Sequence, residues 1–389
     1  MIQLTQNQKD VLDKLLGWYK NKAKNQFITL GGFAGTGKTT LISIFREKLY
    51  KLDPKLKVAF CAYTGKAARV LKTKLIENDS IYAKDNVSTI HSLIYSPITN
   101  NNHEIIGWEQ KQIDEVRYDL IIIDEASMVD LNIWKDLLSY AIPIIAVGDH
   151  GQLPPINSGF SLMQRPLLRL EQIHRQAEGN PIIEISILAR TRGFIPHKEY
   201  SNITKKINRS ADDAQTLIGE LLESYDDDTL LLCGYNNTRI KLNKHIREVK
   251  NFHSPSPLAG DKVICLRNNH KKNIYNGMTG KLSSIEDGGD DWYYAKIDLE
   301  DEETKFEGLI YAPQFNNPES LNFTTNRKAV MQGDLFDFGY AMTVHKAQGS
   351  QAKKVILFEE KFRQMDDEMW RRWLYTAVTR AEKELYIVG

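Results

Sequence analysis

Apolar residues in the first part of the chain follow two different periods. NQFITL (25–30) and YDLIIIDEAS (118–127) contain consecutive apolar residues, which is typical of strands buried on both faces of a parallel sheet. Between them, TLISIFREKLYKL (40–52) places apolar residues such as Leu41 and Phe45 at helical spacing. This alternation predicts an α/β fold in which helices cover a parallel sheet.

The later part of the chain changes its pattern twice. Residues 181–256 keep an α/β character, with TLLLCGYN as a buried strand and NTRIKLNKHIREV as a basic helix. In residues 257–335, short strands such as DKVICLRN and DWYYAKIDL are separated by NG, GG and DEE turns, which predicts a small β-barrel. Buried strands return in residues 336–389 as KKVILFEE and ELYIVG. The barrel is therefore predicted to interrupt a second α/β domain.

A shorter insertion is predicted within the first domain, which we place at residues 1–180. SLIYSPITNNNHEIIGWEQKQ consists of two short β-like runs around a polar NNN turn, and this indicates a hairpin over residues 92–116. Two alternatives are open for this hairpin: its tip acts on a ligand, or it only packs on the domain that carries it.

The composition limits the class of protein. With 389 residues, of which 42% are hydrophobic and 26% charged, the chain can bury more than one core. It has no apolar run long enough for a membrane helix, and its polar start, MIQLTQNQKD, lacks a secretory signal. Its three cysteines form no C-x-x-C pair, which argues against a zinc site or a disulfide framework. We expect a cytoplasmic protein with no membrane partner. The net charge of +1 neither favours nor excludes binding to nucleic acid.

The strongest local signal is GFAGTGKT (32–39), which lies between a predicted strand and a predicted helix. Its glycines allow backbone N–H groups to close around the β- and γ-phosphates of a nucleotide at a helix N-terminus. Lys38 adds a positive charge, and Thr39 offers a hydroxyl to Mg²⁺. The residues expected to bind ATP here are Gly32, Gly35, Thr36, Gly37, Lys38, Thr39 and Thr40.

Acidic and amide side chains follow two other buried strands. Asp124 and Glu125 end the run LIIIDE, at the strand edge where ligands bind in doubly wound sheets. We expect Asp124 to hold Mg²⁺ and Glu125 to orient and deprotonate the attacking water. The strand AIPIIAVGD leads to Gln152, an uncharged group that can contact the γ-phosphate. These features predict nucleotide hydrolysis, which kinases, GTPases, AAA-type machines and motors share.

The remaining motifs carry a family resemblance. LTQNQKDVL, GFAGTGKTT, YTGKAARVL, STIHSL, DEAS, GDHGQLPP, IHRQ, TVHKAQGS and YTAVTRA occur in this order. They resemble the motifs of superfamily 1 helicases in the 5′–3′ branch that contains RecD-type and Dda-type enzymes. The resemblance extends from Gln8 to the last residue. It implies two RecA-like P-loop motor domains, with a pin hairpin inserted in the first and an SH3-like barrel, signalled by YNGMTGKL, in the second.

The resemblance assigns further residues to the nucleotide. Gln8 matches a glutamine that reads the adenine edge, although a surface glutamine on the first helix is the alternative. Arg175 and Arg380 match arginines that reach the γ-phosphate, the second from the other motor domain. Without the family, Arg380 would be interpreted as a helix-surface residue. Gly349 of TVHKAQGS is assigned to the nucleotide side of its loop.

The resemblance also implies a path for single-stranded DNA. Hydroxyl and cationic side chains suit phosphate contacts, which give affinity without sequence preference. One departure is Tyr63, which stands where the family commonly has proline; its ring can stack on a base or pack inward. The tip of the pin would be formed by Ile105, Ile106 or Trp108. The residues expected to bind DNA are Thr64, Lys66, Thr89, His91, Trp108, Thr343, His345 and Lys346.

The function implied by the resemblance is ATP- and Mg²⁺-dependent unwinding of duplex DNA, with 5′ to 3′ movement along one strand. The expected partners are single-stranded DNA and its junctions with duplex DNA. We expect a monomer in a bacterial or phage-infected cell, acting in DNA replication, repair or recombination, with a single-strand-binding or replisome protein as a possible associate. Two alternatives are open: a translocase that displaces proteins and unwinds weakly, and an RNA-directed helicase.

Overall fold

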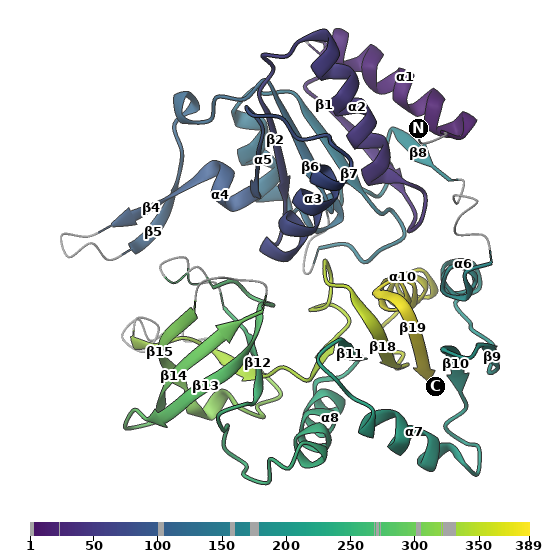
Figure 1. The fold of residues 1–389 in the computed structure, drawn as a ribbon, viewed down its shortest axis with the longest axis vertical. Helices are drawn as coiled ribbons and strands as arrows, with labels where there is room; N and C mark the ends of the chain where they lie inside the picture. The colour runs from purple at the N-terminus through teal and green to yellow at the C-terminus, as the bar shows by residue number, and fades with distance from the viewer. Residues whose placement is uncertain are drawn as a thin grey trace. The chain divides into compact units, whose positions relative to one another are not determined.

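The computed structural model describes residues 4–22, 24–99, 105–155, 160–171, 179–267, 269, 272, 274–300, 305–319, 321 and 332–389. The chain forms two compact units (Figure 1). The first contains Met1–Arg190 and Gln348–Ser350, and the second contains Thr191–Ala347 and Gln351–Gly389. The boundary after Arg190 lies within helix α6 (Pro181–Arg192), beyond the expected position at residue 180. Among the described residues, none of the helices is long and apolar enough to cross a membrane.

The first unit is built on a parallel sheet, as the apolar runs predict. Its order is β3-β2-β6-β7-β1-β8, and every neighbouring pair is parallel. The strands are β1 (Phe27–Gly32), β2 (Val58–Ala62), β3 (Asn86–Thr89), β6 (Leu120–Asp124), β7 (Ile144–Gly148) and β8 (Leu168–Leu170). The helices before α6 are α1 (Gln6–Lys20), α2 (Lys38–Leu52), α3 (Gly65–Glu77), α4 (Ile90–Ile94) and α5 (Leu131–Ser139), with short 3₁₀ turns η1 (Ile113–Glu115) and η2 (Ala126–Met128).

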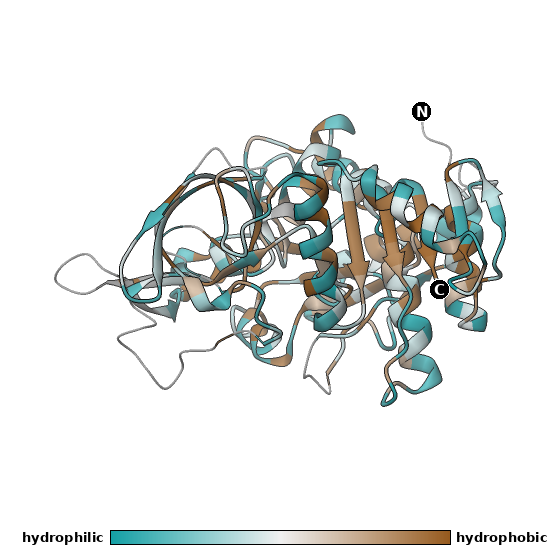
Figure 2. Ribbon diagram, turned by 90° about the horizontal axis from the view of Figure 1, so that it is seen from below, coloured by the Kyte–Doolittle hydropathy of each residue, from teal (hydrophilic) through white to brown (hydrophobic). Residues whose placement is uncertain are grey.

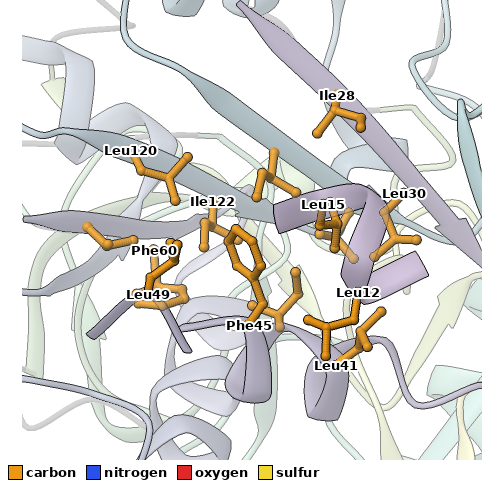
Figure 3. Close-up of a cluster of buried hydrophobic side chains, with 14 of the residues drawn as sticks. Leu12, Leu15, Ile28, Leu30, Leu41, Phe45, Leu49, Phe60, Leu120 and Ile122 are labelled. Carbon is orange, nitrogen blue, oxygen red and sulfur yellow. The ribbon is translucent and has the colours of Figure 1, made fainter. Parts of the chain in front are cut away.

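Strand β6 contains four consecutive apolar residues because both of its faces are buried. Leu120 and Ile122 belong to a core with α1 and α2, whereas Ile121 and Ile123 belong to a second core with α4 and α5. Successive strand residues point to opposite faces, so a strand covered on both sides must be apolar throughout. Figure 3 shows part of the first core, in which the labelled residues are Leu12, Leu15, Ile28, Leu30, Leu41, Phe45, Leu49, Phe60, Leu120 and Ile122.

The predicted hairpin is present, but its strands are shorter than residues 92–116. β4 (Tyr95–Thr99) pairs antiparallel with β5 (Ile105–Gln110). The preceding residues form α4 because the Thr89 hydroxyl accepts a hydrogen bond from Ser92 N and caps that helix. Trp108 lies opposite Pro97 within the ladder. The side chains of the other two proposed tip residues, Ile105 and Ile106, lie outside the described residues.

The second unit contains another six-stranded sheet, with the order β17-β11-β18-β19-β10-β9. Its strands are parallel except for the β9–β10 pair. They are β9 (Glu199–Ser201), β10 (Thr204–Ile207), β11 (Thr229–Cys233), β17 (Ala341–Thr343), β18 (Ala352–Phe358) and β19 (Ala381–Val388). The helices are α7 (Ala214–Glu223), α8 (Asn236–Val249) and α10 (Asp367–Val378). Figure 2 shows hydrophobic residues concentrated along sheet strands, while the helices carry both kinds of residue.

An antiparallel sheet interrupts the second α/β sheet between β11 and β17. Its order is β15-β14-β13-β12-β16. The strands are β12 (Lys262–Cys265), β13 (Thr279–Asp287), β14 (Trp292–Leu299), β15 (Lys305–Tyr311) and β16 (Phe336–Phe338), and the 3₁₀ turn η5 (Ala312–Gln314) follows β15. Because β16 pairs with β12, the insertion extends beyond the expected end at residue 335. Arg247 of α8 holds it through two bonds to the Asp261 carboxylate, at 2.8 and 3.0 Å.

Candidate nucleotide site and nucleic-acid interface

The glycine-rich loop joins β1 to α2 in the first unit. Gly35 and Gly37 have φ angles of +78° and +79°, which residues with a Cβ rarely adopt. Gly37 is also the N-cap of α2, and it has no side chain to occupy the first N–H groups of the helix. At Gly32, a Cβ atom would lie 2.6 Å from Thr36 Oγ1. The predicted glycines are therefore required by the backbone path of the loop.

Lys38 and Thr36 hold the loop in its conformation. Lys38 Nζ donates to the carbonyl oxygens of Gly32 (2.7 Å) and Phe33 (3.1 Å), and Thr36 Oγ1 donates to Phe33 O (2.8 Å). Thr39 and Thr40 follow in the first turn of α2, where they are partly exposed. The ammonium group therefore lies over the loop that the sequence assigns to phosphates.

Gln8 is buried, so the alternative of a surface glutamine is wrong. Its side chain is only 3% exposed. The Oε1 atom accepts a hydrogen bond from Thr5 N (3.0 Å) as part of a capping box, and Nε2 donates to Thr36 O (3.1 Å). Gln8 thus connects the start of α1 to the glycine-rich loop. Its contact with adenine stays a prediction.

The two side chains expected to bind metal lie together. Thr39 and Asp124 line one small cavity, whose other lining residues are Ile42, Leu71, Ile122 and Val147. A hydroxyl and a carboxylate are oxygen ligands of the kind Mg²⁺ prefers, and Mg²⁺ usually keeps several waters beside one or two protein groups. The described residues contain no cluster of three or more His, Cys, Asp or Glu side chains arranged to hold a metal, and the metal contacts of Thr39 and Asp124 stay a prediction.

Glu125 has a left-handed backbone conformation, with φ of +51°. Its N–H donates to Asp124 Oδ1 (2.9 Å), and it directly precedes the turn η2. A non-glycine residue in this region costs about 1–3 kcal/mol, and such residues cluster at functional sites. The backbone therefore turns sharply between the two adjacent acidic residues.

A stack of side chains beside the glycine-rich loop was not predicted. The Phe33 ring lies 4.1 Å from the His150 ring, and the Arg190 guanidinium lies 3.9 Å from the Phe33 ring centre. Burial lowers the pKa of His150, so its imidazole is neutral near pH 7. Gln152, two residues later, is 4% exposed. No sequence signal identifies this stack because Phe33 occupies a variable position of the motif and Arg190 belongs to a distant helix.

The two predicted γ-phosphate arginines have different outcomes. Arg175 lies outside the described residues. Arg380 follows α10 in the second unit and is 2% exposed, so the interpretation as a helix-surface residue is wrong. Its Nε donates to Thr376 O (2.9 Å), and a terminal nitrogen donates to Thr379 Oγ1 (3.3 Å). The contact of Arg380 with ATP stays a prediction.

Two of the threonines expected to contact DNA cap helices. The Thr64 hydroxyl accepts from Ala67 N (3.2 Å) at the start of α3, as the Thr89 hydroxyl does for α4. His91 has the ring of Tyr63 on one side, at 5.9 Å, and the ring of Tyr95 on the other, at 5.7 Å.

Tyr63 also packs partly on the core beneath it, so inward packing accounts for part of its ring. Burial lowers the pKa of His91, against the opposing charge of Asp130. The side chain of Lys66 lies outside the described residues, and Trp108 is exposed.

The loop TVHKAQGS is divided between the two units. Thr343, His345 and Lys346 belong to the second unit, in which burial lowers the pKa of His345 and brings that of Lys346 to about 8. Gln348 and Gly349 belong to the first unit. Gln348 Nε2 donates to Leu153 O (2.9 Å).

Gly349 has a φ angle of +76°, and a Cβ on it would lie 3.3 Å from Thr64 Oγ1 and 3.4 Å from Met128 Sδ. Gly349 therefore lies beside both a predicted DNA-binding loop and the turn that follows the acidic pair.

A parallel sheet, a glycine-rich loop before a helix, and an acid at the end of a neighbouring strand define a P-loop NTPase. Two family models match the chain: an AAA domain over residues 3–195 and a UvrD-like helicase C-terminal domain over residues 338–388. The resemblance to RecD- and Dda-like helicases of superfamily 1 is confirmed by these matches.

Relatives from bacteria and a phage match nearly the whole chain. The ATP-dependent RecD2 DNA helicase of Deinococcus radiodurans is 27% identical over 410 residues, which cover 99% of this chain. The chain spans only 49% of the length of that relative. The ATP-dependent DNA helicase dda of Enterobacteria phage T4 is 24% identical over 452 residues, covering 99% of both chains.

The fold is also similar to that of a solved helicase. The Pif1 helicase from Bacteroides, in complex with ADP-AlF3 and single-stranded DNA, matches with a TM-score of 0.55 and 18% identity. The match covers 100% of this chain and 92% of that chain. Pif1 helicases contain two RecA-like domains, and this chain shares their α/β architecture.

Proposed function

We propose that this protein is an ATP-dependent DNA helicase that moves 5′ to 3′ along single-stranded DNA and separates duplex DNA. The observation that carries the proposal is the position of Gly349 of TVHKAQGS against Thr64 and Met128. It brings a strand-binding motif next to the turn after Asp124, and Asp124 and Thr39 of the P-loop helix line one small cavity. The names of the relatives, two of them ATP-dependent DNA helicases, support the same activity.

In the proposed reaction, Lys38 moves from the loop carbonyls to the phosphates of ATP, and Gln8 contacts the adenine. Thr39 and Asp124 would hold Mg²⁺, which would neutralise charge on the phosphates. Glu125 accepts a proton from the attacking water. Gln152 contacts the γ-phosphate, and the guanidinium groups of Arg175 and Arg380 stabilise the charge that develops on it.

The proposed DNA path uses hydroxyl and basic groups of both units. We assign the first unit to the first motor domain, with the β4–β5 hairpin as its pin, and the second six-stranded sheet to the second motor domain. The antiparallel sheet from β12 to β16 is assigned to an SH3-like barrel. The protein acts as a monomer on single strands and forked junctions, with a single-strand-binding or replisome protein as a possible associate. The proposed DNA-binding residues are Thr64, Lys66, Thr89, His91, Trp108, Thr343, His345 and Lys346.

ATP hydrolysis, measured alone and with single-stranded DNA or RNA, tests the class and the substrate together. We expect stimulation by DNA above that by RNA. Lys38→Ala should abolish hydrolysis while the protein still binds DNA. Lys51→Ala is the matched control, because Lys51 lies on the same helix α2 but is exposed and paired with Glu47. Full hydrolysis by Lys38→Ala would refute the site, and stronger stimulation by RNA would favour an RNA-directed enzyme.

Forked substrates with a single tail test the direction of movement. We expect unwinding of a duplex that carries a 5′ tail and none with only a 3′ tail. Unwinding only from the 3′ tail would refute the proposed direction. DNA-stimulated hydrolysis without strand separation on either substrate would instead identify a translocase that does not unwind.

A further inference from the structure

The base of the β4–β5 hairpin is attached to the end of helix α5. Tyr95 and Gln110 are register partners at the base of the ladder. The Tyr95 hydroxyl donates to the Asp136 carboxylate, and Gln110 Nε2 donates to Ser139 Oγ (2.6 Å) and Asp136 O (3.2 Å). Burial and Asp136 raise the pKa of Tyr95, so this hydroxyl stays protonated as a donor. Both strands are thus anchored to one helix (Figure 1).

Tyr140, the residue after α5, holds the chain on both sides of the hairpin. Its hydroxyl lies 2.9 Å from Ile94 O, just before β4, and 2.8 Å from Lys111 O, just after β5. The ring is buried, with 3% exposed. Lys111 adds two bonds across the base, from N to Ile94 O (2.9 Å) and from Nζ to Ser92 O (2.7 Å).

These contacts determine whether the hairpin is rigid. An isolated two-stranded hairpin is marginally stable in water, so its direction depends on what holds its base. The Tyr140 hydroxyl is within hydrogen-bond distance of two carbonyls, one just before β4 and one just after β5, so it links the two ends of the hairpin. Tyr140 therefore restrains both strands at the point where they leave the body of the first unit.

The other end of α5 begins close to the acidic pair. Glu125 is followed by η2 and by Asp130, whose Oδ1 caps α5 through Asn132 N (2.8 Å) and Ile133 N (3.1 Å). The buried face of α5, which includes Ile133, packs against the core under the sheet. Helix α5 therefore extends from the turn after the acids to the base of the hairpin.

We propose that α5 and Tyr140 form a brace that holds the β4–β5 hairpin at a fixed angle on the first unit, so that movement along DNA is converted into strand separation. Tyr140, Asp136 and Gln110 are positioning residues in this brace. The inference rests on the proposed helicase function, and it adds a role for residues that are not among the proposed nucleotide-binding or DNA-binding residues.

The test compares Tyr140→Phe with wild-type protein on a 5′-tailed fork and on single-stranded DNA. The variant keeps the ring and removes only the hydroxyl. We expect its unwinding rate to fall about tenfold, while ATP hydrolysis on single-stranded DNA stays within about twofold of wild type. Amide hydrogen exchange in residues 95–99 and 105–110 should become faster. Tyr50→Phe is the matched control. Tyr50 lies on helix α2, its ring stacks on the ring of Tyr82, and it is not part of the brace.

A second variant tests the brace at an exposed position, where a substitution is not expected to disturb folding. Gln110 is exposed, so Gln110→Ala removes its bonds to α5 without changing the core, and it should reduce unwinding in the same selective way. If both variants lose unwinding and hydrolysis equally, or if neither variant loses unwinding, the brace is overturned. The proposed helicase function still stands in that case, provided that the wild-type protein unwinds the fork. Failure of the wild-type protein to unwind the fork would instead overturn the proposed function, and the brace with it.

Discussion

Lys346 should make DNA binding depend on pH in a range where most side chains do not titrate. Burial, helped by the nearby positive charge of Arg239 and opposed by the negative charge of Asp337, lowers its pKa from an ordinary value of 10.5 to about 8. A lysine with this pKa is about nine-tenths protonated at pH 7 and about one-tenth protonated at pH 9.

The size of the effect follows from linkage. A DNA phosphate beside Lys346 favours the ammonium form and raises its pKa toward the ordinary value, so binding takes up a proton above pH 8. The affinity is full below the pKa of the free protein and falls as the pH rises through it. If the ordinary value is restored in the complex, the affinity at pH 9 is about tenfold lower than at pH 7, or about 1.4 kcal/mol.

Fluorescence anisotropy with a labelled single strand measures this effect, at constant salt because phosphate contacts are salt-dependent. Lys346→Arg is the control, since arginine stays charged across the range. We expect a clear decrease in affinity for wild-type protein and a flat profile for the variant. Identical profiles for the two proteins would show that Lys346 does not contact phosphate.

Three other predictions concern buried contacts. Gln8→Ala removes the link between α1 and the glycine-rich loop, so we expect a higher KM for ATP and about 1 kcal/mol less stability in thermal unfolding. Asp85→Ala leaves the fully buried Arg46 guanidinium without its ion-pair partner, and urea denaturation should show a loss of about 3–5 kcal/mol. Gly193→Ala forces a φ of +63° on alanine and brings Cβ within 3.2 Å of Trp370, so we expect about 1 kcal/mol of destabilisation in the same assay, whereas an unchanged midpoint would contradict the strain.

Local signals account for the features that the sequence predicted well. The glycine-rich loop is confirmed because its glycines and the following helix are adjacent in sequence and determine one backbone path. The apolar run ending at Asp124 is confirmed as a buried strand because helices cover both of its faces. The presence of a hairpin and of an inserted sheet of short strands was likewise predicted from turns and periodicity.

The burial and the contacts of individual side chains could be found only from the tertiary structure. Gln8 and Arg380 lie on or beside helices whose sequences do not show what covers them, and both are buried. The Phe33 stack and the Tyr140 clamp join residues that are far apart in the chain, so no local pattern predicts them.

The sequence by itself therefore determined the P-loop, the α/β course of the chain and the resemblance to a helicase family, because these depend on motifs, their spacing and apolar periodicity. Only the tertiary structure decided which side chains are buried, which carbonyls they bond and which titrate at unusual pH. Those properties depend on burial and on long-range contacts, which form when distant segments pack together.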